Sequence, residues 1–409
     1  MSMVPASDFK ILPTAIVFVL LLVTPLGVAG QNVGLAIAII GFLFWTFQGR
    51  HRKAEKFFAA GPISQFITLW ALFTIPIAMA TIRRGAIQDS ARFVLGQVMA
   101  AAMVVGALRL RTAFMRRDVL LNTATLLIGF MGVIAASQML IGWKLEGIKF
   151  ADQIKRAQGF YSHPLTFAYV SLVFMPWGFA RVMARPKQWQ SWVIALGLAL
   201  ILTTTQSVTV LCVSALVVFF LMTRLLSKKH LVISTLLAVT AVATLINTPN
   251  PIQTKFQMVL SGQRGDHETP YPDDRMAFWH AHWEMIKDSP WLGHGTGLEA
   301  VDRRPYYEAL GLGHLKRMYE AHNMYLQAAV EGGVIASLAV MAFLAWWFRI
   351  AKKNRATEEW FRLAMMCTPV AFALGGLTQN AIQDSEVRYS LMLLCGFSLW
   401  FKRNDDLST

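Results

Sequence analysis

Long apolar runs alternate with short polar segments along almost the whole chain. Twelve runs reach or approach the roughly 20 residues that a helix needs to cross a membrane. They fall near 11–29, 33–48, 64–82, 93–110, 119–141, 164–183, 191–206, 207–226, 230–248, 333–350, 361–380 and 387–401. The pattern predicts a single all-helical, polytopic membrane domain over residues 1–409, with the first run retained as a helix. Separation of the seventh and eighth helices depends on a short polar turn at 203–207.

Basic residues indicate which connections face the cytoplasm. Most of the 38 Lys and Arg residues fall near the two ends of the chain or in every second connection, namely 49–56, 109–118, 181–188, 223–230 and 349–362. Cytoplasmic connections of membrane proteins carry such an excess. Both termini are therefore expected in the cytoplasm, and segment 249–332, between helices nine and ten, is expected as a long outer loop.

Composition agrees with this class of protein. The chain is 55% hydrophobic and only 15% charged, with a mean hydropathy of +0.47. Its net charge of +15 argues weakly for nucleic-acid binding, because the membrane orientation rule already demands many basic residues. Cys212, Cys367 and Cys395 all fall in predicted spans, where cysteines usually pack rather than form disulfides.

The polar chemistry is concentrated on the outer connections. No Asp, Glu, Lys, Arg or His falls in the central part of a predicted span. Ion-coupled transporters usually need such residues along their path. The pattern favours chemistry at the outer surface, although a flippase gated only by its loops remains an alternative.

Two outer segments carry arginines that could bind an anion. The first reads Arg156 followed by "GFYSHP", in which His163 precedes the next predicted span. The second begins with a helix predicted over 274–287, with Arg275 in its first turn and Trp279 on the same face. A helix N-terminus with a guanidinium suits a phosphate. The alternatives are a headgroup anchor for Arg156 and pairing with a neighbouring aspartate for Arg275.

Histidines in the long loop do not form a metal motif. His280 and His282 are two positions apart, so on a helix they point in different directions. No HExxH motif or Cys/His cluster occurs. We predict no metal and no cofactor, and we interpret "GHGTG" (293–297) as a tight turn after the helix.

The stretch "AHNMYLQAAVEGG" (321–333) contains the strongest candidate for a general base. If a helix begins near Ala321, His322 and Tyr325 share a face. Histidine titrates near pH ~6.5 and suits removal of a proton from a hydroxyl. The alternative is an interfacial histidine bonded to a carbonyl, and Asn323 is explained equally well as a helix cap.

The end of this stretch is less easily connected to His322. Glu331 lies about half a turn away in angle, so it is not expected to orient His322 within one unbroken helix. Gly332 and Gly333 are expected to break the helix and let the next span pack closely. Fixed positive charge from Arg156 and Arg275 would suit an anionic leaving group, such as a diphosphate carrier.

These residues resemble those of the O-antigen ligase and polymerase superfamily, most closely the O-antigen ligases. The resemblance rests on Arg156 with "GFYSHP", on Arg275 with Trp279 and "DSPWLGHGTG", and on "HNMYLQAAVEGG". It implies an inner-membrane glycosyltransferase of the GT-C-like type, with a helical periplasmic loop. The implied reaction transfers a glycan, without metal, from undecaprenyl diphosphate to a sugar hydroxyl of lipid A–core, which completes lipopolysaccharide.

The motif match implies roles for individual residues. His322 would be the base, and Arg275 and Arg156 would hold the diphosphate. Supporting residues would be Asn323, Tyr325, His163, Trp279 and Arg388. One departure is that many members carry Ser-Arg where this chain has Ser207 and Val208. A replacement arginine is therefore left open among Arg156, Arg83, Arg84 and Arg92.

Three other functions fit part of the pattern. A polymerase would use the same donor and extend it with another lipid-linked glycan. A protein O-glycosyltransferase would share the His-Asn motif. A lipid-linked glycan flippase would need no base, so His322→Ala would leave it working.

Overall fold

The described part of the molecule is built from helices. The computed structural model describes residues 61–110, 117–142, 156–161, 163–236, 253, 274–315, 320–354 and 358–400. Its main helices are α4 (Gly61–Arg83), α5 (Ile87–Leu110), α6 (Arg117–Ile141), α7 (Pro164–Ala184), α8 (Trp189–Thr204), α9 (Val208–Leu225), α12 (Asp274–Asp288), α13 (Ala300–Ala309), α14 (Met324–Lys353), α15 (Glu359–Gly375) and α16 (Ser385–Trp400). The predicted spans 11–29 and 33–48, and most of 230–248, lie outside the described residues.

Several helices meet the requirements for crossing a membrane. Five segments are long and apolar enough, namely Gly61–Arg83, Ala124–Ile141, Pro164–Ala184, Val208–Leu225 and Met324–Lys353. Helix α8 is apolar but shorter. It ends at Thr204 and α9 begins at Val208, so the polar turn predicted at 203–207 does separate two helices.

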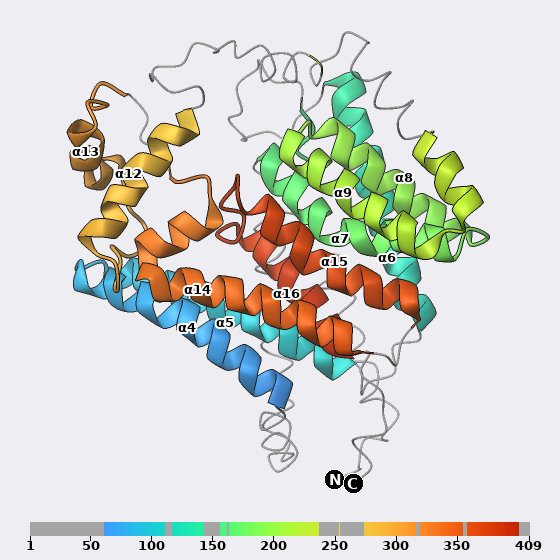
Figure 1. Ribbon diagram of the computed structural model, residues 1–409, viewed down its shortest axis with the longest axis horizontal. Coiled ribbons are helices and arrows are strands. Elements are labelled where there is room, and N and C mark those ends of the chain that lie inside the picture. Colours follow the sequence, from blue (N-terminus) through green and yellow to red (C-terminus); the bar gives the residue numbers. More distant parts are fainter. Residues whose placement is uncertain are drawn as a thin grey trace, which may run out of the picture.

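The helices pack in two groups with α15 and α16 between them (Figure 1). Helix α14 packs along α4, α16 along α5, and α6 along α8. Helix α15 contacts both α14 and α7, which joins the two groups. Large buried aromatic residues, including Phe66, Phe343 and Trp347, fill the core between α4 and α14. Burial of such side chains supplies most of the favourable packing energy in a helix bundle.

Helix α14 begins earlier than the apolar run suggested. Its first residue is Met324, whereas the run predicted a span from 333. The helix is broken at Gly332 and Gly333, as the sequence predicted, and Gly333 has φ 73°. A Cβ at Gly333 would lie 2.1 Å from the Trp291 carbonyl oxygen, so only glycine lets the α12–α13 connection approach this closely. Helix α15 also ends before the predicted 380, at Gly375.

The connections that carry the candidate site meet at one end of the bundle, which we call the site end. Ala157 N donates to Thr204 O over 3.0 Å. Thr378 and Thr209 are joined through their hydroxyls at 2.9 Å. The connection between α12 and α13 docks on the end of α4, where the Arg83 guanidinium donates to Gly293 O at 2.9 Å. These segments are distant in sequence, so the fold itself assembles the site.

Candidate functional site

His322 lies on a tight turn immediately before α14. Its φ is 46°, in the left-handed region that non-glycine residues seldom adopt. The expectation that His322 shares a helix face with Tyr325 is therefore wrong. Asn323 is the reason, because its side chain caps α14 by accepting from Tyr325 N at 2.9 Å and Leu326 N at 3.1 Å. The N-cap residue itself has an extended backbone, so the helix begins only after Asn323.

Contacts from three segments hold the His322 turn. The Trp279 indole on α12 donates to Ala321 O at 2.9 Å, and the Gln327 side chain accepts from Ala321 N at 3.0 Å. The His322 Nδ1 atom lies 3.3 Å from Gln379 Oε1. A left-handed non-glycine residue costs about 1–3 kcal/mol and persists only where its surroundings enforce it. Strain of this kind is typical of functional positions.

Asn323 and Tyr325 join α14 to the end of α15. Asn323 Nδ2 donates to Leu377 O at 3.1 Å, and the Tyr325 hydroxyl donates to Ala373 O at 2.9 Å. Met324 N adds a bond to Gly376 O at 2.7 Å. These two side chains therefore fix the position of the turn through main-chain groups.

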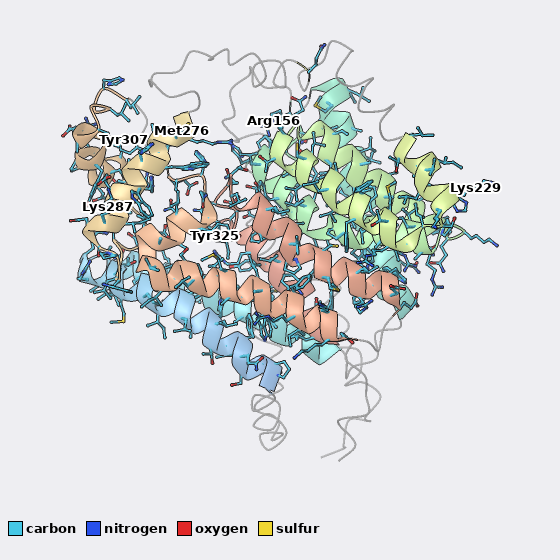
Figure 2. The ribbon with its side chains drawn as sticks, viewed as in Figure 1. Arg156, Lys229, Met276, Lys287, Tyr307 and Tyr325 are labelled. Atoms are coloured by element: carbon cyan, nitrogen blue, oxygen red, sulfur yellow. The ribbon has the colours of Figure 1, made fainter. Side chains whose placement is uncertain are left out.

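Arg156 lies at the turn between α8 and α9. Its Nε donates to Thr205 O at 2.6 Å, and Figure 2 shows Arg156 at the site end, on the same side as Met276 at the start of α12. Burial lowers the pKa of its guanidinium, but an arginine still remains charged at neutral pH. Arg156 thus brings positive charge to the turn that immediately precedes Val208.

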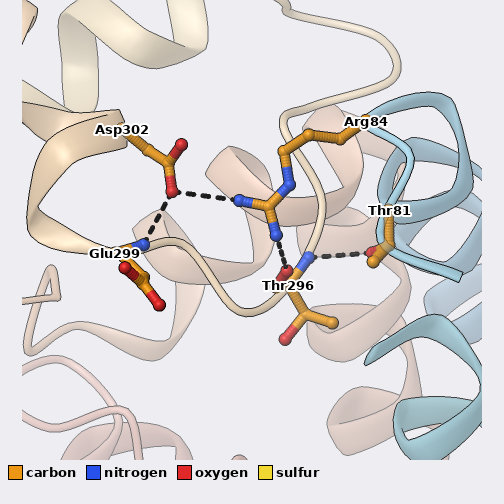
Figure 3. A network of polar contacts seen from close by, with 5 residues as sticks. All are labelled: Thr81, Arg84, Thr296, Glu299 and Asp302. Atoms are coloured by element: carbon orange, nitrogen blue, oxygen red, sulfur yellow. Dashed lines mark hydrogen bonds and ion pairs between the residues drawn. The ribbon is translucent and has the colours of Figure 1, made fainter. Parts of the chain in front are cut away.

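The other arginines left open by the sequence have different partners. Arg84 donates to Asp302 at 3.1 Å and to Thr296 O at 2.6 Å (Figure 3). Arg83 donates to Gly293 O. Arg92 pairs with Asp89 at 3.6 Å on the surface, with its side chain 78% exposed. Arg83 and Arg84 thus anchor the α12–α13 connection, which leaves Arg156 as the arginine at the 203–207 turn.

The glycine-rich stretch 293–297 is a docking segment. His294 N donates to Val330 O at 2.7 Å, and Gly295 N donates to Glu331 O at 2.9 Å. Gly293 has φ 67°, and a Cβ there would lie 2.6 Å from Val330 O. The stretch is a tight turn after the helix, as predicted. The N–H groups of His294 and Gly295 bind carbonyl oxygens next to the break in α14, so these two groups are not directed at a phosphate.

Arg275 stands in the first turn of α12, as the sequence predicted. It is half-buried and acts electrostatically on Tyr169 of α7. The Tyr169 hydroxyl in turn donates to Gly375 O at 2.8 Å. Arg275 therefore acts from the start of α12 on a residue that contacts the end of α15. Its predicted alternative partners were Asp273 and Asp274, and both of these side chains lie outside the described part of the chain.

His163 caps α7 and belongs to the same electrostatic group. Its Nδ1 accepts from Leu165 N at 3.0 Å, and α7 starts at Pro164 as predicted. Burial, together with the nearby charges of Arg156 and His322, lowers the pKa of His163 to about 4. His163 is therefore neutral at pH 7, and Arg156, His163 and His322 are close enough to influence one another.

The neighbouring histidines of α12 face different surroundings. His282 is buried, with its Nδ1 2.7 Å from Phe278 O, and burial lowers its pKa to about 4. His280 is exposed. The two side chains thus point apart, as their spacing predicted. Among the described residues, no group of three or more His, Cys, Asp or Glu side chains has the arrangement of a metal site.

Arg388 is buried near the start of α16. Its side chain is 7% exposed and donates to Ile382 O at 3.1 Å and Gln383 O at 3.2 Å. It therefore stabilises the turn before α16. Its supporting role in the site stays a prediction.

Sequence reasoning missed the glutamines that surround His322. Gln379 contacts the imidazole directly, Gln327 binds the adjacent peptide, and Gln383 donates to Glu331. Asp384, a few residues further on, accepts from Thr166 at 2.8 Å, and burial raises its pKa to about 6. Neutral amides carry no signal in a charge pattern, so only the spacing Gln327–Glu331 on one helix face could have drawn attention to them.

Comparison with known proteins finds a family resemblance in the part of the chain that contains the candidate site. The family model described as O-antigen ligase matches residues 192–341, which include Arg275 and His322. None of the curated proteins matches the chain significantly. The matched region runs from α8 into α14 and contains the docked connection and the strained turn. Residues 192–341 of this helical chain, which has several apolar helices long enough to cross a membrane, are thus similar to the O-antigen ligase family.

Proposed function

We propose that this protein transfers an O-antigen glycan from undecaprenyl diphosphate to a sugar hydroxyl of lipid A–core. The site end would face the periplasm, because Arg185 and Glu358, which pair beyond the opposite ends of α7 and α14, belong to basic connections that would face the cytoplasm. The observation that carries the proposal is the strained turn at His322, φ 46°, with Arg156 and Arg275 on neighbouring elements of the same end.

His322 would act as the general base. With Nδ1–H donating to Gln379 Oε1 at 3.3 Å, its Nε2 holds the lone pair. The acceptor hydroxyl oxygen attacks the anomeric carbon of the donor while its proton passes to Nε2. The bond between the anomeric carbon and the phosphate oxygen breaks, and the lipid diphosphate leaves. Direct displacement of this kind inverts the anomeric centre.

The arginines would stabilise the leaving group. Negative charge develops on the bridging phosphate oxygen as the glycosidic bond breaks, and fixed guanidiniums stabilise such charge without reorganisation. Arg275 also benefits from its place in the first turn of α12, where free N–H groups favour anions. His163, neutral at pH 7 with its pKa of about 4, would not add to this charge or compete for the hydroxyl proton.

Gene deletion with complementation tests the proposal. We expect the deletion strain to accumulate long glycans on the lipid carrier and to carry none on lipid A–core, with both pools compared on gels. Wild-type protein should restore transfer, and His322→Ala should not, although it is present in the membrane at equal amount. Lipid A–core carrying single repeats would identify a polymerase. Full activity of His322→Ala would exclude the general base and favour a flippase.

A further inference from the structure

Two buried polar side chains lie one turn apart at the start of α14. Gln327 is 2% exposed and Glu331 is 4% exposed. The Gln327 amide nitrogen donates to Glu331 Oε1 at 2.8 Å, while its oxygen accepts from Ala321 N at 3.0 Å. A side-chain amide has one donating end and one accepting end. Glu331 therefore determines that the accepting end of Gln327 faces the peptide next to His322.

Glu331 also connects the other segments around the site. The Gln383 amide from the turn before α16 donates to the same carboxylate. The main-chain oxygen of Glu331 accepts from Gly295 N of the α12–α13 connection at 2.9 Å. Gln379, which contacts His322, lies in the same stretch as Gln383. One residue thus joins the three segments that enclose the His322 turn.

Burial of Gln327 and Glu331 costs free energy. Glu331 lies in a helix that is long and apolar enough to cross a membrane. Burying a carboxylate in such surroundings is unfavourable unless several hydrogen bonds compensate for lost hydration. A leucine would pack at this position without that cost. A purely stabilising role therefore accounts poorly for the Gln–Glu pair.

We propose that Gln327 and Glu331 are positioning residues that hold the Ala321–His322 peptide in its left-handed turn. The proposal rests on the proposed function, since it assigns these residues to the step in which His322 takes the hydroxyl proton. Trp279 binds the oxygen of Ala321 and Gln327 its nitrogen, so this residue is held from both sides. A shift of about 1 Å in a reacting group can lower a rate about 100-fold.

The pair predicts a particular pattern of kinetic defects. In the full-length protein in lipid nanodiscs, with a lipid-diphosphate glycan and lipid A–core, Gln327→Leu and Glu331→Leu should each lower kcat roughly 10- to 100-fold. KM for the donor should change little, because neither residue touches the diphosphate. The double variant Gln327→Leu/Glu331→Leu should be no slower than the slower single variant, because both act through Ala321. Multiplied losses, or a defect confined to KM, would overturn the proposal.

Conservative and control variants separate positioning from chemistry and folding. Glu331→Gln keeps an accepting oxygen and should retain most of kcat, whereas its complete inactivation would make Glu331 a proton acceptor instead. Trp279→Phe removes the other bond to Ala321 and should reproduce the kcat defect. This variant tests the proposal even where the leucine variants do not fold. Ser398→Ala breaks a buried bond to Trp347 at 2.7 Å near the far end of α14 and should leave kcat unchanged. Glycan transfer by the His322→Ala variant would contradict the proposed function. A wild-type kcat for Gln327→Leu, with His322→Ala inactive, would contradict only the positioning role.

Discussion

The Arg156 guanidinium donates through Nε to the main-chain oxygen of Thr205 over 2.6 Å. That bond fixes a charged group at the turn between α8 and α9, where the chain has Val208. This bond orients the guanidinium through Nε, and the two terminal nitrogens would bind an oxyanion in the proposed site.

Arg156→Lys should therefore lower transfer about 10- to 100-fold, because an ammonium cannot bind Thr205 O and a phosphate with the same planar fork. The measurement is the rate of glycan transfer by purified protein at matched donor concentration. Arg92→Lys, on an exposed surface pair, is the control and should be neutral. Partial rescue of Arg156→Ala by Val208→Arg would show that charge at this turn is what matters. Equal rates for Arg156→Lys and wild type would remove Arg156 from the diphosphate site.

Arg275→Lys should weaken donor use more than acceptor use. Arg275 is half-buried in the first turn of α12. Lysine would lack the planar fork that could bind the diphosphate bidentately at this helix N-terminus, so we expect kcat/KM for the donor to fall about 10- to 100-fold. Arg304→Lys on the exposed side of α13 is the matched control. A defect seen only in KM for lipid A–core would place Arg275 at the acceptor instead.

Most of the described helices could be predicted from the sequence, because each has a local cause. Apolar runs predicted α4 to α9, and Pro290 limits α12. Gly332 and Gly333 indicated the break in α14. In each case, the physical cause lies within a few residues of its effect.

The geometry around His322 could not be predicted, because it depends on contacts between distant segments. Local pattern allows a helix to start at Ala321, but the Asn323 cap decides the start. Glu331 was judged too far in angle to orient His322, which is correct for direct contact. The structure connects them through Gln327 and the main chain of Ala321. The bonds that Arg388 donates to two carbonyl oxygens of the turn before α16 could not be predicted from its position in the sequence either.

Gly293→Ala should destabilise the protein by about 2–4 kcal/mol, because it combines left-handed strain with a steric clash. Its φ is 67°, and the new Cβ would lie 2.6 Å from Val330 O. Gly311→Ala is a matched control, with φ 71° and nothing within 4 Å of its Cβ. It should cost only about 1 kcal/mol. Thermal unfolding of both variants checks the difference, and equal losses would show that docking against α14 contributes nothing.

Stability should fall as the pH drops from 6.5 towards 4, because of His282. Burial lowers its folded-state pKa to about 4, whereas an unfolded histidine titrates near ~6.5. Between these values the unfolded chain binds a proton that the folded chain does not, so acid favours unfolding. The loss attributable to His282 should approach on the order of 3 kcal/mol below pH ~4 and vanish above pH ~6.5. Thermal unfolding across this range should show a flatter profile for His282→Phe, with His280→Phe at the exposed neighbour keeping the wild-type profile. Identical slopes for wild type and His282→Phe would mean that another group governs the acid sensitivity.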